Sequence, residues 1–109
     1  NLENVSRFTL KKEASLPTEY ALSQNFPNPF NPTTTISYSI PENSEVKLTI
    51  YNLTGRRITD LVQDQISAGI YSVNWDGKND TGLPVSSGLY LYTIETANYR
   101  AMKKMIFMK

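Results

Sequence analysis

The sequence contains no cysteine and no histidine among its 109 residues. Without cysteine the chain forms no disulfide, no thiolate metal site and no cysteine nucleophile. Without histidine it also lacks the commonest general base and the commonest ligand of transition metals. These two absences remove most of the common catalytic and metal-binding site types.

An excess of charge of one sign is also lacking, because 11 basic and 10 acidic residues leave a net charge of +1. This balance gives no electrostatic reason to expect nucleic acid or an anionic membrane as a partner. No apolar run approaches the ~20 residues that span a membrane. The chain begins NLENVSRFTLKKE, which lacks the layout of a signal peptide. We therefore expect a part of a longer chain, or a mature form.

Helical periodicity is missing from every segment longer than ten residues, whereas alternation of apolar and polar residues recurs along the chain. In TTTISYSI the residues Ile36, Tyr38 and Ile40 share one face, and in VKLTIYN the inward face is Val46, Leu48 and Ile50, with Lys47 and Thr49 outward. The turn PENSE joins these two segments, which predicts a hairpin. The pattern predicts seven strands, at residues 20–25, 33–40, 46–52, 56–62, 70–75, 89–96 and 100–109. Seven short strands are typical of an antiparallel, immunoglobulin-like β-sandwich, which we place at residues 18–109, after a linker or domain tail at residues 1–17.

The segment NFPNPF, residues 25–30, precedes the first clear strand. Its prolines, with Pro32 just beyond, exclude it from a helix and from the interior of a sheet. One interpretation is that it shapes a corner of the sandwich, where Phe26 and Phe30 cover an open end. The other is that a rigid, exposed turn serves recognition, because little order is lost on binding. Both interpretations are compatible.

Several separated motifs then resemble a known family: NFPNPFNPTTTISYSI, KLTIYNLTGRRI, SAGIYSVNWDG, DTGLPVSSGLYLYTI and the terminal KKMIFMK. In this order they resemble the type A C-terminal sorting domain of the bacterial type IX secretion system, found in the Bacteroidetes and related phyla. The WDG and V-S-S-G-L-Y motifs also resemble the immunoglobulin-like domain of flagellar hook-capping proteins, which normally lacks the opening PNPFNP and the lysine-bounded end.

The first resemblance implies a folded export signal at the end of a larger secreted protein. Its implied partners are the outer-membrane type IX machinery and the sorting peptidase, and its implied locations are the periplasm in transit and then the cell surface or the medium. Three patches carry over by position: the proline patch (Pro27, Asn28 and Pro29), the glycine–aromatic patch (Gly88, Leu89 and Tyr90) and the terminal patch (Lys103, Lys104 and Lys109, around residues 105–108). Their expected partner-binding residues are Pro27, Asn28, Pro29, Gly88, Tyr90, Lys104 and Lys109. Gly88 and Tyr90 have the alternative role of holding the fold. The discriminator is gene position, because a sorting signal ends the reading frame, and here the chain ends directly after KKMIFMK.

The final segment, RAMKKMIFMK, alternates poorly, since residues 105–108 are consecutively apolar. It is either a strand buried on both faces near its end or an edge strand that is offered to a partner by strand addition. The flanking lysines would keep such an edge soluble.

Three other functions are weaker alternatives. The loop DGKNDTG offers Asp76, Asn79 and Asp80 as oxygen ligands for Ca²⁺, but it lacks the EF-hand spacing, and Asp and Asn beside Gly are usual in turns. We expect no resident cofactor. A carbohydrate platform would need outward aromatic residues, for which Tyr51, Tyr92 and Tyr99 are the candidates, and structural spacing or assembly is a further alternative. The scattered carboxylates, and serines without a base beside them, predict that the domain is not an enzyme.

Overall fold

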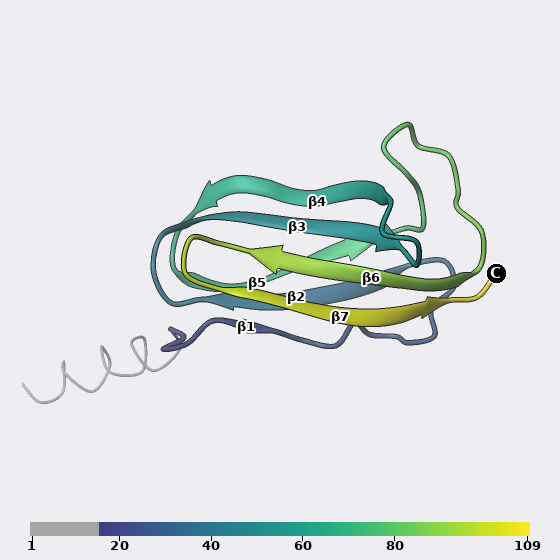
Figure 1. Cartoon of the computed structure of the whole chain (residues 1–109). Helices are drawn as coiled ribbons and strands as arrows, with labels where there is room; N and C mark the ends of the chain where they lie inside the picture. Colours follow the sequence, from purple (N-terminus) through teal and green to yellow (C-terminus); the bar gives the residue numbers. More distant parts are fainter. Residues whose placement is uncertain (1–15) are drawn as a thin grey trace, which may run out of the picture.

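The chain folds into two antiparallel β-sheets (Figure 1). The computed structural model describes residues 16–109, so most of the predicted linker, residues 1–17, lies outside the described residues, and the boundary at residue 18 stays a prediction. The strands are β1 (Ala21–Leu22), β2 (Thr34–Ile40), β3 (Ser44–Asn52), β4 (Arg57–Ile66), β5 (Gly69–Trp75), β6 (Gly88–Glu95) and β7 (Arg100–Phe107).

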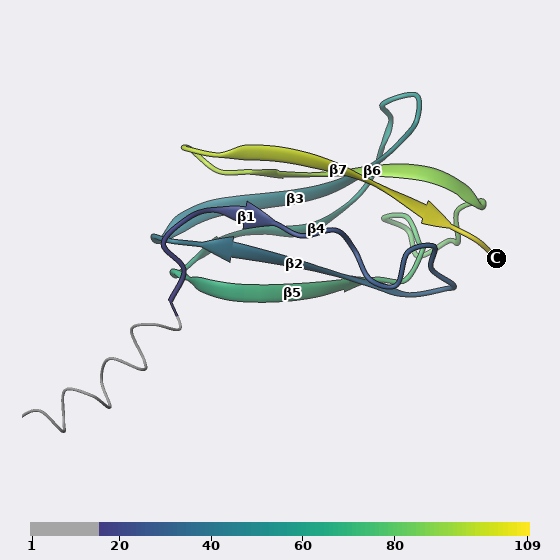
Figure 2. The same cartoon turned by 90° about the horizontal axis from the view of Figure 1, so that it is seen from below.

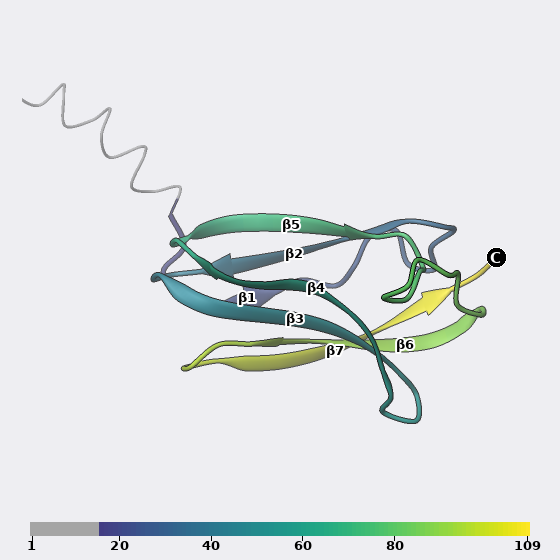
Figure 3. The same cartoon turned by 90° about the horizontal axis from the view of Figure 1, so that it is seen from above.

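One sheet has the strand order β1-β2-β5 and the other has the order β4-β3-β6-β7. Seen from above, they form two layers, with β5 and β2 in one and β3, β6 and β7 in the other (Figure 3). The predicted all-β, immunoglobulin-like sandwich is therefore confirmed. No helix among residues 16–109 is long and apolar enough to cross a membrane.

The hairpin predicted for β2 and β3 is wrong. β2 pairs with β1 and β5, whereas β3 pairs with β4 and β6, so the turn between them carries the chain from one sheet to the other. The apolar sides of the two strands therefore face each other across the core instead of lying side by side. A tight polar turn fits both arrangements, and the alternation of side chains is the same in each.

The core lies where the two inward faces meet, as the alternation predicted. Ile36 and Ile40 of β2 are fully buried, and so are Val46, Leu48 and Ile50 of β3. Apolar burial of this kind is the main favourable contribution to folding. One predicted outward residue also proves to be buried: Thr49 is 1% exposed, because Asp60 of β4 and Thr93 of β6 flank it on the outer face of the sheet.

Two further expectations need correction. Residues 64–66, which lie between two predicted strands, belong to β4, and this strand runs to Ile66 with two register shifts against β3. Tyr92, a candidate for an outward aromatic residue, is fully buried, because it lies on the inward face of β6 with Tyr90 and Ile94.

Four parts of the chain gather at one end of the sandwich. The loop after β1, the turn between β3 and β4, the loop 76–87 and the C-terminus lie at this end in all three views (Figures 1, 2 and 3). The proline-rich segment, the start of β6 and the C-terminal segment are therefore close together, although they are far apart in the sequence.

Candidate recognition surface

The proline-rich segment carries the chain from one sheet to the other. Phe26 forms a backbone bridge with Thr35 of β2, whereas Phe30 forms a parallel bridge with Phe107 of β7. The crossing therefore takes place over Pro27, Asn28 and Pro29. Prolines have no N–H to donate to a ladder, so the chain can leave the first sheet here without breaking pairs of its own.

Two buried polar side chains hold the start of this crossing. Asn25 is 2% exposed, and its Nδ2 donates to the carbonyl of Pro27 (3.1 Å) and to Oγ1 of Thr34 (3.0 Å). Thr34 Oγ1 in turn donates to the same Pro27 carbonyl (2.8 Å). Buried polar groups that are fully paired fix one local arrangement. As a result, Pro27, Asn28 and Pro29 are presented to solvent on a well-defined turn.

The end of the crossing is attached to the outer edge of β7. The N–H of Ile106 donates to Oδ1 of Asn28 (2.9 Å), and its carbonyl accepts from the N–H of Phe30 (3.0 Å). The N–H of Met108 donates to the Phe30 carbonyl (3.0 Å). The proline patch and the terminal patch thus form one continuous surface, which we call the PNP–β7 surface: residues 24–32, β7, Met108 and Lys109.

An aromatic cluster supports this surface from below. Phe30 stacks on Phe107 with ring centroids 4.8 Å apart and an interplanar angle of 9°, and it tilts against Trp75 at 5.6 Å. Trp75 in turn meets the edge of Tyr90 at 5.4 Å. Aromatic pairs in such geometries add to the gain from burial alone. The prediction that Phe30 covers an open end is confirmed, but Phe26, at 78% exposed, does not.

Phe26 points outward for a simple reason. Its backbone exchanges two hydrogen bonds with Thr35 at the edge of the first sheet, with N–O distances of 2.9 Å. Asn25 is buried, and neighbouring side chains of an extended chain point to opposite sides. The side chain of Phe26 is therefore left on the solvent side.

The glycine of the WDG motif permits close packing under the same cluster. Gly77 has a φ of +74°, and a Cβ placed on it would lie 2.8 Å from Cζ of Phe107. Only glycine fits both the left-handed backbone and this contact. Trp75 Nε1 donates to the carbonyl of Lys78 (2.9 Å), which fixes the loop over the ring.

The residues of the glycine–aromatic patch divide into two kinds. Gly88 is exposed and has a φ of +151°, within the range that favours glycine. Tyr90 is 5% exposed, and its hydroxyl donates to the carbonyl of Ser86 (2.7 Å). The ring of Tyr90 is thus part of the cluster under the surface, whereas Leu89 points outward opposite Ile106 of β7.

The terminal lysines lie on or beside β7. Lys104 and Lys109 are exposed and Lys103 is half-buried, and β7 contains no acidic residue. The N–H of Lys109 donates to Oγ of Ser87 (3.0 Å), which ties the end of the chain to the start of β6. Met105 and Phe107 are buried, whereas Ile106 and Met108 are exposed. β7 is therefore an edge strand with one apolar face toward the core.

Three residues that hold this surface in place were not predicted from the sequence. Asn25 and Thr34 were not singled out, although a polar residue just before an aromatic–proline pair is a recognisable turn signal. Gln24 was also missed; its Nε2 donates to the carbonyl of Lys104 (2.7 Å). No local pattern predicts that contact, because the two residues are distant in the sequence.

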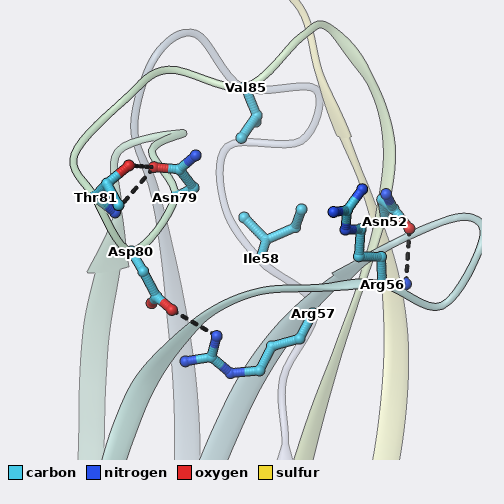
Figure 4. A pocket seen from close by; sticks show the side chains of 8 residues that line it. All are labelled: Asn52, Arg56, Arg57, Ile58, Asn79, Asp80, Thr81 and Val85. Atoms are coloured by element: carbon cyan, nitrogen blue, oxygen red, sulfur yellow. Dashed lines mark hydrogen bonds and ion pairs between the residues drawn. The ribbon is translucent and has the colours of Figure 1, made fainter.

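The loop that offered Ca²⁺ ligands uses its oxygens within the protein (Figure 4). Asn79 Oδ1 accepts from the N–H groups of Thr81 and Leu83 (both 3.0 Å), which is the geometry of a turn. Asp80 forms an ion pair with Arg57 of β4 (2.5 Å), and Asp76 lies 3.9 Å from Nζ of Lys78. In the part of the chain that the structure describes, no three acidic side chains cluster as metal ligands.

Arg57 forms two ion pairs near the loop 76–87, and the first is the pair with Asp80. Its guanidinium also contacts Asp60 (3.2 Å), and it holds the pKa of Asp80 below its usual range. Burial alone would raise the pKa of Asp60, but hydrogen bonds from Thr49 and Arg57 bring it below its ordinary value. Arg57 and Asp80 line a hollow of about 440 Å³ together with Asn52, Arg56 and Ile58. The ion pair between Arg57 and Asp80 joins the loop 76–87 to β4.

The family of the chain follows from its sequence once the fold is known. The model of the FlgD Ig-like domain matches residues 28–99, which is more than half of the chain. The chain belongs to the FlgD Ig-like domain family. Comparison with the curated proteins gives no match.

Several solved structures contain a domain with a fold similar to that of this chain. PorU from Porphyromonas gingivalis superposes with a TM-score of 0.64 at 21% identity over 84% of this chain. PorZ from the same organism gives 0.54 at 18% identity over 83%. FlgD from Xanthomonas campestris gives 0.55 at 21% identity over 89% of this chain and 72% of its own length. The chain spans only 10% of PorU and 11% of PorZ, so it corresponds to a small part of those proteins.

Proposed function

We propose that this domain is a non-catalytic C-terminal sorting signal, which directs a larger exported protein through the outer-membrane type IX translocon. The observation that carries the proposal is the convergence of the motifs. The proline patch, the glycine–aromatic patch and the terminal patch are separated in the sequence. Asn28 accepts from the N–H of Ile106, Phe30 donates to the carbonyl of Ile106, and Lys109 donates to Ser87, beside Gly88, so these bonds bring the three patches together.

A machine that reads folded shape would need such a convergence. The exposed members of the PNP–β7 surface, Pro27, Asn28, Pro29, Lys104 and Lys109, are the contacts that we propose for the translocon and the sorting peptidase. Gly88 and Tyr90 act through the fold, because Gly88 permits the turn into β6 and Tyr90 supports the surface from inside. A rigid turn backed by a buried aromatic cluster loses little freedom on binding.

The neighbouring structures support this reading at the level of fold. PorZ is described as an essential bacterial surface component of the type IX secretion system, and part of it shares the fold of this chain. By extension, we propose that the domain passes through the periplasm and reaches the cell surface or the medium with the protein to which it is attached. No cofactor or metal is needed for such a role.

The second candidate is a structural assembly module, which the family match favours. The FlgD of Xanthomonas campestris is described in terms of hook capping essential for flagellar assembly. A module of this kind would use its surface to hold other subunits in place. The match covers residues 28–99, however, and so leaves out β7 and the lysines that contribute half of the PNP–β7 surface.

Secretion of a reporter separates the two candidates. A reporter with a signal peptide of its own is fused to residues 18–109 and expressed in a strain with an intact type IX system, in a translocon mutant, and without the domain. We expect the reporter at the surface or in the medium only with the domain and the working translocon. A folded fusion that stays in the periplasm of the intact strain would refute the sorting function and favour the assembly module.

A further inference from the structure

Half of the outer edge of β7 forms no backbone hydrogen bonds with the proline-rich segment within residues 16–109, although β1 packs near it. In an antiparallel ladder, the backbone groups of alternate residues point away from the paired strand. Ile106 bonds outward to Asn28 and Phe30, and β7 pairs with β6 without a register shift, so Met102 and Lys104 also direct their backbone outward. Of the outward backbone groups of Met102 and Lys104, the Lys104 carbonyl alone is bonded within the described part of the chain, by Nε2 of Gln24 (2.7 Å). Within residues 16–109 the N–H of Lys104 and both backbone groups of Met102 have no partner.

The outer-face side chains beside this edge alternate between basic and apolar. On the outer face of the sheet, Arg100, Met102 and Lys104 follow one another in the order basic, apolar, basic. Met102 is 61% exposed, and a hollow of about 350 Å³ lies here, lined by Thr93, Arg100, Ala101 and Met102. Arg100 forms an ion pair with Glu95 (2.9 Å), whereas Lys104 forms none within the described residues.

From these observations we propose that β7 binds an extended acidic segment of a partner protein, which adds a strand at Arg100–Lys104 and continues the line begun by Phe30. The backbone groups of Met102 and the N–H of Lys104 supply the hydrogen bonds. The outer face selects a strand with carboxylates opposite Arg100 and Lys104 and an apolar residue opposite Met102, because opposite charges across a strand pair stabilise it. The inference deepens the proposed function, on which its biological role rests, by naming the mode of recognition.

The opposite edge of the same sheet does not suit this ligand. β4 is interrupted by two register shifts against β3, and it carries Asp60 and Asp64, whose carboxylates would repel an acidic strand. Bulges and inward charges are common devices against strand addition. The proposal therefore concerns β7 alone.

A pair of substitutions at one position tests the proposal. Met102→Pro removes the outward N–H, and an edge strand tolerates proline where the N–H faces solvent. Met102→Thr is the matched control, because it changes the side chain but keeps the N–H. The probe is a short synthetic peptide with two glutamates flanking an isoleucine at alternate positions, and the comparison peptide carries lysines in place of the glutamates. Binding is measured by fluorescence anisotropy, and folding of each variant by cooperative urea unfolding.

We expect the acidic peptide to bind the wild-type domain and the threonine variant with similar affinity. Its affinity for the proline variant should be lower by about tenfold or more, because backbone hydrogen bonds are lost. In the wild type, the peptide should also slow amide exchange at Met102 and Lys104, which tests the site without any variant. Equal binding of both peptides, or no change in exchange at these two amides, would overturn the proposal.

The outcome is separable from that of the reporter experiment, because the peptide assay involves no translocon. Peptide binding together with a reporter that stays in the periplasm would refute the sorting function and support the strand addition. Secretion of the reporter without peptide binding would refute the strand addition alone.

Discussion

The two edges of the four-stranded sheet are protected in different ways. Charged side chains protect the edge formed by β4 against strand addition. Arg57 pairs with Asp60 and Asp80, and Thr49 donates to Asp60 (2.8 Å). The edge formed by β7 is closed for half its length by backbone bonds to Phe30 and by a buried aromatic cluster. The arrangement at β4 only protects an edge. The arrangement at β7 also builds a rigid surface beside the open half of the same edge.

This difference predicts where the domain is sensitive to mutation. Exposed ion pairs contribute little, because water and salt screen them. Buried aromatic contacts contribute much more, because their removal leaves a cavity. Changes under the PNP–β7 surface should therefore cost more stability than changes along β4, and the following predictions test this from the largest effect to the smallest.

Phe107→Ala should have the largest effect. Phe107 is 3% exposed and stacks on Phe30, and removal of such a ring lowers the free energy of unfolding by about 3–5 kcal/mol. Urea denaturation measures the change. The matched variant on the other edge is Leu61→Ala, whose side chain is only half-buried, and it should lose clearly less. Equal losses at the two positions would contradict the comparison.

Gly77→Ala should follow. A methyl group at this position meets the ring of Phe107, and the φ of +74° strains any residue with a Cβ. We expect a loss of about 1–3 kcal/mol in the free energy of unfolding, measured in the same way. Gly82→Ala is the control, because its φ of +83° imposes similar backbone strain while nothing lies within 4 Å of the added Cβ. If both variants lost the same amount, the close contact with Phe107 would have no separate role.

Tyr92→Phe tests the hydrogen bond between β6 and the segment that follows β1. The hydroxyl of Tyr92 donates to the carbonyl of Ser23 (2.6 Å), and its loss should cost about 1 kcal/mol at neutral pH. Burial raises the pKa of Tyr92 to about 12. Since this value exceeds that of the unfolded chain, near 10, the stability from the neutral phenol is complete below pH 10 and is lost as the pH rises toward 12.

The measurement for Tyr92 is the free energy of unfolding against pH for wild type and variant. The wild type should lose stability between about pH 10 and 12, and the variant should lose less over the same range. Parallel curves would show that Tyr92 is not the group responsible.

Thr49→Val should have an effect about as small as that of Tyr92→Phe, on the β4 edge. The variant removes the hydrogen bond to Asp60, which contributes about 1 kcal/mol when the carboxylate is charged. The lowered pKa of Asp60 means that its contribution is present above about pH 4 and disappears as the pH falls through the folded pKa. The difference between wild type and variant should therefore shrink in acid. A difference that does not change with pH would assign the effect to packing instead.

The sequence predicted the inward face of each central strand but not the pairing of the strands. Ile36, Ile40 and Leu48 are buried as the alternation predicts, because a period of two depends only on the local backbone. The assignment of β2 and β3 to different sheets depends on contacts with β5 and β6, which lie far along the chain. A hairpin turn and a crossing turn between them look alike in sequence.

The recognition surface was predictable in its parts and not in its assembly. The resemblance pointed to Pro27, Asn28 and Lys104, which are exposed, and Phe30 was expected at an open end. The contacts that join these parts, such as Gln24 with Lys104, link distant residues and leave no local pattern. The burial of Tyr92 was missed for a different reason: the alternation within β6 was not extended through it.

The most direct test of the whole account is secretion of the reporter with charge reversed on the PNP–β7 surface. The double variant Lys104→Glu, Lys109→Glu is compared with Arg56→Glu, an exposed cation on the β4 side, in fusions that unfold cooperatively like the wild type. If the surface is what the translocon reads, the lysine variant should remain in the periplasm while the arginine variant is secreted normally. Normal secretion of both variants would contradict the account.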